Sequence, residues 1–327
     1  SEQVARKIYV KNPTNLYTLQ AKAGKEYHIE ILFKQRNERA TLDFDLGKEV
    51  GIDLNLAVKR VMDADVILFA GGISPSLEGE EMPVDAEGFR KGDRTNIEIP
   101  AVQKEMVKAL VATGKPVVYV VCTGSALALN WENDHVNAIL NAWYGGQEGG
   151  TAVADVLFGD YNPAGRLPIT FYKSVDQLPD FQDYSMKGRT YRYMTQTPLY
   201  PFGYGLSYTT FAYGDLKLSR SEMSAEDSFT ASIELANTGE RTGTEIVQLY
   251  IRDEYSSATR PVKELKGFEK IFLKAGESRK VSFSITPELL KFYNYDLQFV
   301  CEPGDFDVMI GGNSRDVKKA RFLLKGE

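Results

Sequence analysis

The residues best suited to chemistry form an acidic run in the first half of the chain. Six carboxylates lie within the 16 residues from position 78 to position 93, namely Glu78, Glu80, Glu81, Asp85, Glu87 and Asp93. Like charges held close together raise the pKa of at least one carboxyl group, and a general acid at neutral pH needs such a pKa. The same run also suits a solvated acidic loop, and charge alone favours that interpretation.

The elements around the run indicate where it lies. Apolar runs that suit buried strands alternate with helical patterns: strands are predicted over 66–70, 116–122 and 138–142, and helices over 55–64, 100–113 and 149–158. This alternation indicates a parallel sheet covered on both faces. Ligands meet such sheets at the loops after the strands' carboxyl ends, here the loops after Ala70, Cys122 and Trp143. That position brings the catalytic interpretation of the acidic run level with the solvated-loop one.

The two ends of the chain have β patterns. Residues 1–46 contain short β-prone runs separated by turns, too few to close a core, so we expect this domain to begin before Ser1. Residues 160–210 are rich in Pro, Gly and Tyr and predict a long irregular connection. From Phe211 onward, short strands at regular spacing predict an immunoglobulin-like sandwich. Without a Cys–Trp–Cys signature, it is the fibronectin type III-like variant.

Composition excludes several classes of protein. The net charge is −6, and no basic stripe is present to bind nucleic acid. No run of about 20 apolar residues exists to form a membrane-spanning helix. Two cysteines and two histidines at wide spacing make no convincing zinc site, so no metal is expected. For Cys122 and Cys301, free buried thiols are favoured over a disulfide.

Long, ordered motifs resemble family 3 glycoside hydrolases between about Val50 and Leu324. The motifs are Glu78–Glu81, Gly92–Arg94, Asn141–Gly150, Asp155–Pro168 and Tyr200–Phe211. The resemblance implies an α/β sandwich domain followed by a fibronectin type III-like domain, both placed after a (β/α)8 barrel. The segment before Lys48 resembles, more weakly, the end of a protective-antigen-type β-sandwich insert. The expected division is 1–47 for the insert fragment, 48–190 for the α/β domain, 191–210 for a linker and 211–327 for the last domain.

The resemblance also implies a division of catalytic labour. In this family the nucleophile is an aspartate on the barrel, and the general acid/base is a glutamate from the α/β domain. The acidic run matches that pattern with Glu80 as the acid/base and Glu78 as the runner-up, two residues away. Retaining glycosidases need two carboxyl groups about 5 Å apart. The chain contains no recognisable barrel, so we expect it to be inactive alone and to need the barrel as its partner.

Four further residues are candidates for contact with substrate. Trp143 and Tyr144 follow a predicted strand and suit either a stacking platform for a sugar or core packing. Arg94 suits pairing with the acidic run or contact with substrate. Tyr191 lies in the irregular connection and suits the acceptor side of the site or a structural clamp.

Together these features predict the C-terminal part of an exo-acting, retaining β-glycosidase. β-Glucosides or β-xylosides are the expected substrates, no cofactor is needed, and a periplasmic or extracellular location is expected. The alternative is a non-catalytic carbohydrate-binding or scaffolding module.

Overall fold

The computed structural model describes residues 19–31, 51, 53–79, 81–82, 84 and 86–326. The chain divides into two compact units, Ser1–Asp53 and Leu54–Glu327. In the first unit, Gly24 adopts a φ of 75° in the turn that the sequence predicts there. No strand forms within 19–31, although the β-prone run from Tyr27 is one of those predicted within 1–46, because a β-prone run becomes a strand only when it pairs with a neighbour. The other strands predicted before Lys48 lie outside the described residues.

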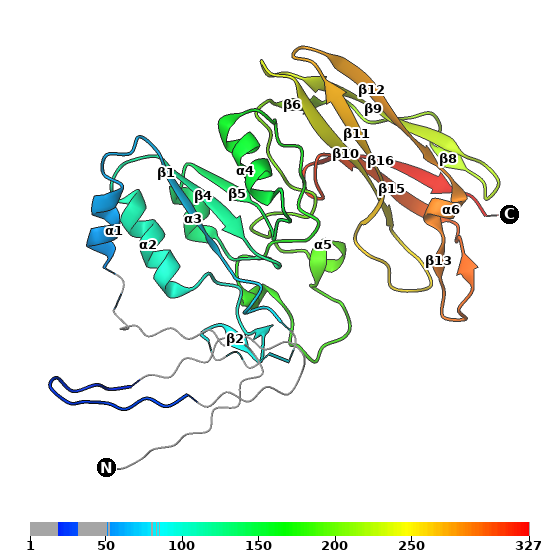
Figure 1. Ribbon diagram of the computed structural model, residues 1–327. Helices are drawn as coiled ribbons and strands as arrows, with labels where there is room; N and C mark the ends of the chain where they lie inside the picture. Colours follow the sequence, from blue (N-terminus) through cyan, green and yellow to red (C-terminus); the bar gives the residue numbers. More distant parts are fainter. Residues whose placement is uncertain are drawn as a thin grey trace, which may run out of the picture. The chain divides into compact units, whose positions relative to one another are not determined.

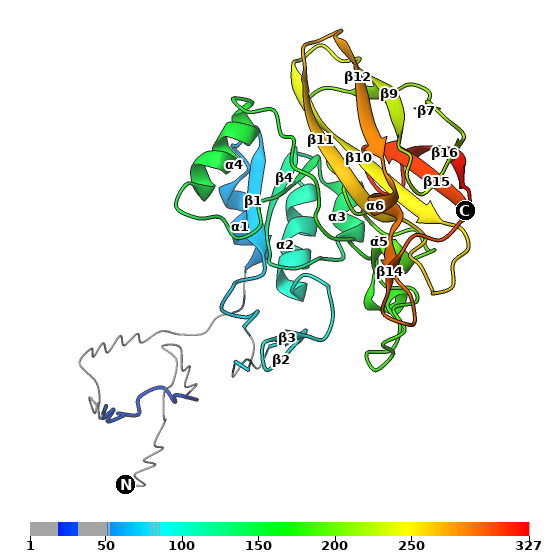
Figure 2. The ribbon, with the colours of Figure 1, turned by 90° about the vertical axis from the view of Figure 1, so that its right-hand side faces the viewer.

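The second unit begins with a three-stranded parallel sheet in the order β1-β4-β5. Its strands are β1 (Ile67–Gly72), β4 (Val117–Cys122) and β5 (Ala138–Asn141). The helices of this part are α1 (Leu54–Arg60), α2 (Ala101–Val111), α3 (Asn130–His135) and α4 (Gly149–Phe158). Figures 1 and 2 show α2 on one side of the strands and α4 on the other. The predicted parallel α/β class is confirmed.

Two local features were not predicted. The helix α3 has the sequence Asn-Trp-Glu-Asn-Asp-His, in which glutamate is the only strong helix former and no apolar periodicity is present. A small hairpin pairs β2 (Phe89–Arg90) with β3 (Asp93–Arg94), and each strand has only two residues. Such short elements give no periodic signal, and tertiary contacts decide whether they form.

The end of β1 is fixed in position, which matters for the loop that follows it. Gly72 has a φ of 119°, and a Cβ there would lie 2.0 Å from the Cys122 carbonyl oxygen, so only glycine fits. The Gln103 side chain of α2 accepts a hydrogen bond from the Gly72 N–H (2.7 Å) and donates one to the Gly72 carbonyl (2.8 Å). The acidic loop therefore leaves the sheet from a rigid point.

The connection after α4 is irregular, as predicted, with only the short helices η1 (Val175–Gln177) and α5 (Thr190–Tyr193). It is nevertheless held firmly to the sandwich. Phe202 accepts a hydrogen bond at its carbonyl from the Ser314 N–H (2.9 Å), and Gln248 donates to the Gly203 carbonyl (3.1 Å). Arg166 forms a buried ion pair with Glu245 (2.7 Å). The connection is thus part of the packed structure.

The last part is a sandwich of two sheets, in the orders β11-β10-β15-β16-β8 and β12-β9-β6, with β7 beside β9 (Figures 1 and 2). Its main strands are β9 (Phe229–Asn237), β10 (Gly243–Asp253), β11 (Glu264–Leu273), β12 (Ser278–Ile285), β15 (Gly304–Gly311) and β16 (Val317–Leu324). Its minor elements are β6 (Phe211–Tyr213), β7 (Lys217–Leu218), β8 (Glu222–Met223), α6 (Pro287–Leu290), β13 (Phe292–Tyr293) and β14 (Phe299–Val300).

Between the two sheets lies one apolar core, which includes Leu235, Leu249, Phe306 and Phe322. Alternating inward residues on both sheets fill this core, as in fibronectin-type sandwiches. Besides its main strands, the sandwich has strands of only two or three residues, namely β6, β7, β8, β13 and β14, and such short strands carry no periodic signal. The predicted sandwich class is confirmed.

Two further expectations concern the whole described chain. Cys122 and Cys301 are free thiols, as predicted, although each is only half-buried. Within the described residues, no helix has the length and apolar character needed to cross a membrane.

Candidate active site

The loops after all three parallel strands meet at one carboxylate, that of Glu78. Glu78 lies in the loop after β1, Gly124 and Ser125 follow β4, and Tyr144 follows β5. Arg94, at the end of β3, also pairs with Glu78. The carboxyl ends of parallel strands face the same edge of a sheet, so this is the edge at which ligands are expected. We refer to Glu78, Arg94, Ser125 and Tyr144 as the Glu78 cluster.

Four donors surround the Glu78 carboxylate. Oε1 accepts hydrogen bonds from Ser125 Oγ (2.6 Å) and Arg94 Nη1 (3.3 Å). Oε2 accepts from the Tyr144 hydroxyl (2.5 Å) and the Gly124 N–H (3.1 Å). The side chain is 12% exposed. Burial raises the pKa of Glu78, but the four hydrogen bonds outweigh burial and hold the pKa below its ordinary value.

Arg94 is itself held in place by the backbone around it. Its Nε donates to the Asn96 carbonyl and its Nη2 to the Glu98 carbonyl, both at 3.0 Å. The guanidinium lies 5.0 Å from the centre of the Phe89 ring across the hairpin. With its cation oriented by two carbonyls and a ring, Arg94 presents its remaining nitrogen to Glu78.

Two glycines permit the close packing of this region. A Cβ at Gly92, whose φ is 90°, would lie 1.6 Å from the Gly79 carbonyl oxygen. A Cβ at Gly124 would lie 2.8 Å from the Tyr144 ring and 3.0 Å from Glu78 Oε2. The hairpin and the loop after β4 can therefore approach the acidic loop only because these positions are glycine.

The predicted acid/base Glu80 lies outside the described residues, as does Asp85. Its chain neighbours Gly79 and Glu81 are described, and Glu81 has a φ of 55°. The assignment of the proton donor to Glu80, with Glu78 as runner-up, therefore stays a prediction.

Trp143 and Tyr144 are neighbours in the chain but have different surroundings. Tyr144 is 37% exposed, and its hydroxyl donates to Glu78; burial and this bond raise its pKa. Trp143 is half-buried with a φ of 55°, and its ring meets the buried Phe171 edge to face at 6.2 Å. Tyr144 thus belongs to the Glu78 cluster, whereas Trp143 packs against the connection.

Tyr191 contacts the sandwich and takes no part in the Glu78 cluster. Its ring stacks on Phe202 at 4.3 Å and meets the buried Tyr250 edge to face at 5.9 Å. Its hydroxyl accepts a hydrogen bond from the Leu265 N–H (3.2 Å), and burial raises its pKa. These contacts join α5 to β10 and β11.

Sequence reasoning identified the loop after Cys122 but named no residue within it. The residues missed are Gly124 and Ser125, and Thr123 supports them. The buried Thr123 hydroxyl donates to the Ser125 carbonyl (2.9 Å) and accepts from the Ser125 N–H (3.2 Å). The signal that could have identified them is the Thr-Gly-Ser sequence directly after an apolar strand. Small polar residues at the carboxyl end of a strand are well placed to donate hydrogen bonds to a ligand or to a carboxylate.

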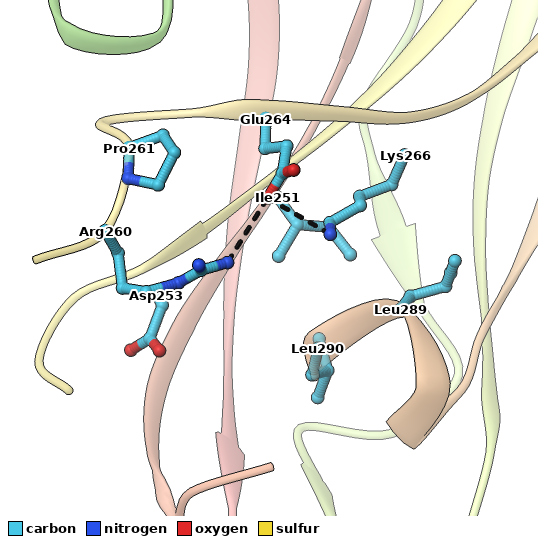
Figure 3. A pocket seen from close by; sticks show the side chains of 8 residues that line it. All are labelled: Ile251, Asp253, Arg260, Pro261, Glu264, Lys266, Leu289 and Leu290. Atoms are coloured by element: carbon cyan, nitrogen blue, oxygen red, sulfur yellow. Dashed lines mark hydrogen bonds and ion pairs between the residues drawn. The ribbon is translucent and has the colours of Figure 1, made fainter. Parts of the chain in front are cut away.

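A hollow lies in the sandwich and is lined by residues that include Asp253, Arg260 and Glu264 (Figure 3). Glu264 pairs with Arg260 (3.2 Å) and Lys266 (3.1 Å). Burial raises the pKa of Asp253 to about 6 against the attraction of Arg260. Nowhere in the described part of the chain do three His, Cys, Asp or Glu side chains gather as a metal site. The Glu78 cluster is therefore the stronger candidate for a functional site.

Comparisons with known proteins agree with this architecture. The glycosyl hydrolase family 3 C-terminal domain matches residues 4–208, and a fibronectin type III-like domain matches residues 245–314. A xylan 1,4-beta-xylosidase of Xylanibacter ruminicola is 46% identical over 99% of this chain and 37% of its own length. A periplasmic beta-glucosidase of Salmonella typhimurium is 46% identical over 88% of this chain and 39% of its own length.

Solved structures give the same result. A β-glucosidase of Erythrobacter marinus superposes with a TM-score of 0.74 at 39% identity, over 83% of this chain and 36% of that one. A β-glucosidase of Listeria innocua in complex with glucose has a TM-score of 0.72 at 32% identity, over 84% of this chain and 38% of that one. The chain thus spans less than two fifths of these relatives. It belongs to glycosyl hydrolase family 3 and corresponds to the family's C-terminal domain followed by a fibronectin type III-like domain.

Proposed function

We propose that this chain is the C-terminal part of an exo-acting, retaining β-glycosidase and supplies its general acid/base, Glu80. The nucleophile is an aspartate on an N-terminal barrel of the same protein. The observation that carries this proposal is the convergence of the loops after β1, β4 and β5 on Glu78. It holds the loop two residues before Glu80 at the sheet edge where ligands are expected, which supports the role of this loop.

The chemistry explains why two domains share the site. The barrel carboxylate attacks the anomeric carbon from one side, while Glu80 protonates the departing oxygen from the other. Glu80, now ionised, takes a proton from water, which then releases the sugar from the nucleophile. Hydrolysis by this route needs no cofactor. Because the two carboxyl groups must lie about 5 Å apart, the site exists only when both domains are docked.

The relatives support β-xylosides or β-glucosides as the substrates of the whole protein. They are named as a xylan 1,4-beta-xylosidase and a periplasmic beta-glucosidase, and the second name supports a periplasmic or extracellular location. We further propose the domain division 1–47, 48–190, 191–210 and 211–327. The first segment is the end of a β-sandwich insert.

The test is a comparison of leaving groups in the full-length protein. A general acid matters most when the leaving group is poor. Glu80→Ala should therefore reduce hydrolysis of xylobiose or cellobiose by at least about a hundredfold while sparing the first step with a dinitrophenyl glycoside. Azide should restore turnover by attacking the intermediate without a base. Glu81→Ala is the matched control and should show neither effect. Azide rescue of Glu81→Ala, or none in Glu80→Ala, would remove Glu80 from the role.

A carbohydrate-binding or scaffolding module is the second candidate, and exposed aromatic residues of the sandwich favour it. Tyr293, Tyr295 and Phe299 on the β13–β14 hairpin are 66%, 76% and 45% exposed. Such rings can stack on sugars. The 327-residue chain should then bind insoluble xylan or cellulose, and Tyr293→Ala should abolish binding. Failure to sediment with either polymer would exclude this candidate.

A further inference from the structure

We infer that Glu78 is a positioning residue, which stays ionised through turnover and holds the loop that carries the proton donor. This inference deepens the proposed function and rests on it. A carboxylate offers about four lone-pair sites, and Glu78 receives four donors, two on each oxygen. No site is left for a departing glycosidic oxygen.

Two of the four donors cannot reverse their role. The hydroxyls of Ser125 and Tyr144 can rotate and accept a proton, but the Gly124 N–H and the Arg94 guanidinium can only donate. Gly124 faces Oε2 and Arg94 faces Oε1, so each oxygen keeps one donor that can never become an acceptor, and a proton on either oxygen would have to displace the hydroxyl donor beside it. Arg94 and Tyr144 are the charged and titratable groups that contact Glu78, and both favour its ionised form. To act as a proton donor, Glu78 would have to leave the cluster.

The same bonds join four segments of the chain. Through Glu78, the loop after β1 is tied to the hairpin, to the loop after β4 and to the loop after β5. Because Gly79 also lies against Gly92, the acidic loop is held on two sides directly before Glu80. A group that must protonate an oxygen at hydrogen-bond distance needs this kind of support.

The charge of Glu78 has a second consequence. A negative charge two residues from Glu80 disfavours ionisation of Glu80, and so helps to keep the donor protonated. If Glu78 were neutral, Arg94 would remain as an uncompensated cation and would favour ionisation of Glu80. Loss of the Glu78 charge should therefore lower the pH above which the enzyme loses its general acid.

The experiment uses Glu78→Gln in the full-length protein, with Glu87→Gln as the control. Glu87 lies in the same acidic run and is exposed, so its substitution makes the same change of charge without touching the cluster. For Glu78→Gln we expect the basic limb of the pH profile of kcat/KM to move down by about half a pH unit. We expect kcat for a disaccharide to fall about tenfold, with no rescue by azide. Glu87→Gln should leave the basic limb in place.

A second measurement needs no activity. In the 327-residue chain, selectively ¹³C-labelled glutamate carboxyls are titrated by NMR, and the Glu78 signal is assigned by its loss in Glu78→Gln. It should titrate below the ordinary range for glutamate, and Tyr144→Phe should move its midpoint upward by removing one donor.

The outcomes separate this inference from the proposed function. Azide rescue of Glu78→Ala, or a Glu78 midpoint above the ordinary range, would overturn the positioning role and make Glu78 the donor. An unmoved basic limb in a folded Glu78→Gln variant would reduce Glu78 to a structural residue. A full-length wild type that hydrolyses no aryl β-glycoside would refute the proposed function itself, whereas the NMR titration would still decide whether Glu78 stays ionised.

Discussion

The ion pair between Arg166 and Glu245 joins the two parts of the second unit, and its removal should destabilise both. Arg166 lies in the connection after α4, and Glu245 lies on β10. Their side chains are 8% and 6% exposed, and the nitrogen–oxygen distance is 2.7 Å. Glu245 also accepts a hydrogen bond from the Tyr213 hydroxyl (3.1 Å). Burial raises the pKa of Glu245, and the attraction of Arg166 opposes that rise.

The magnitude follows from what remains when Arg166 becomes methionine, which keeps most of the apolar stem. The buried carboxylate then keeps only the Tyr213 hydroxyl and the Ile246 N–H and has no counter-charge, and an unpaired buried charge costs about 3–5 kcal/mol. Glu245 can escape this cost by taking up a proton, which costs about 1.4 kcal/mol for each pH unit above its ordinary pKa. We therefore expect Arg166→Met to lose about 3 kcal/mol at pH 7 and about 1 kcal/mol at pH 5.

The sign of this pH dependence is specific. In the variant, the folded-state pKa of Glu245 lies above its unfolded value. Stability is then greatest below the unfolded pKa and is lost as the pH rises through the folded pKa. The double variant Arg166→Met with Glu245→Leu removes both charges and should recover more than half of the loss.

Urea unfolding with two probes tests this reasoning. Both tryptophans, Trp131 and Trp143, lie before the sandwich, so tryptophan fluorescence follows the α/β part, while far-UV circular dichroism also follows the strands. Both midpoints should fall in Arg166→Met at pH 7. A loss of stability below about 1 kcal/mol at pH 7, or an equal loss at pH 5 and pH 7, would contradict a stabilising role for this buried ion pair.

Three further predictions follow from buried or exposed groups. Burial raises the pKa of Asp253 to about 6 beside Arg260, so the contribution of Asp253 to stability falls as the pH rises through 6. In thermal unfolding, Asp253→Asn should therefore raise the free energy of unfolding by about 1 kcal/mol at pH 7.5 and leave it unchanged at pH 4. Glu132 is fully buried, without a hydrogen-bond partner on any other described residue, and burial raises its pKa. Because the cost of burying its charge grows with pH, Glu132→Gln should raise the melting temperature at pH 8 more than at pH 5. Chymotrypsin should cut first at Phe181 or Tyr184, which are 87% and 84% exposed, and a first cut between 200 and 210 detected by mass spectrometry would contradict this.

Local patterns were enough to predict most elements near the site. The apolar runs at 116–122 and 138–142 became β4 and β5, and the helix predicted over 149–158 has those bounds as α4. Buried strands and amphipathic helices carry a periodic signal that neighbouring residues reinforce. The order of the motifs was enough to suggest the family, which the comparisons confirmed.

The amino-acid sequence by itself thus determined the classes of both folded parts, the sheet edge at which to search and the acidic run that lies there. Only the tertiary structure decided which side chains meet. Glu78 receives donors from Arg94, Ser125 and Tyr144, which are 16, 47 and 66 residues away along the chain. It likewise decided that Tyr191 packs on the sandwich and that Arg166 pairs with Glu245. The physical reason is that periodicity reports how each segment is buried, whereas hydrogen bonds between loops depend on strand order and register, which no single segment encodes.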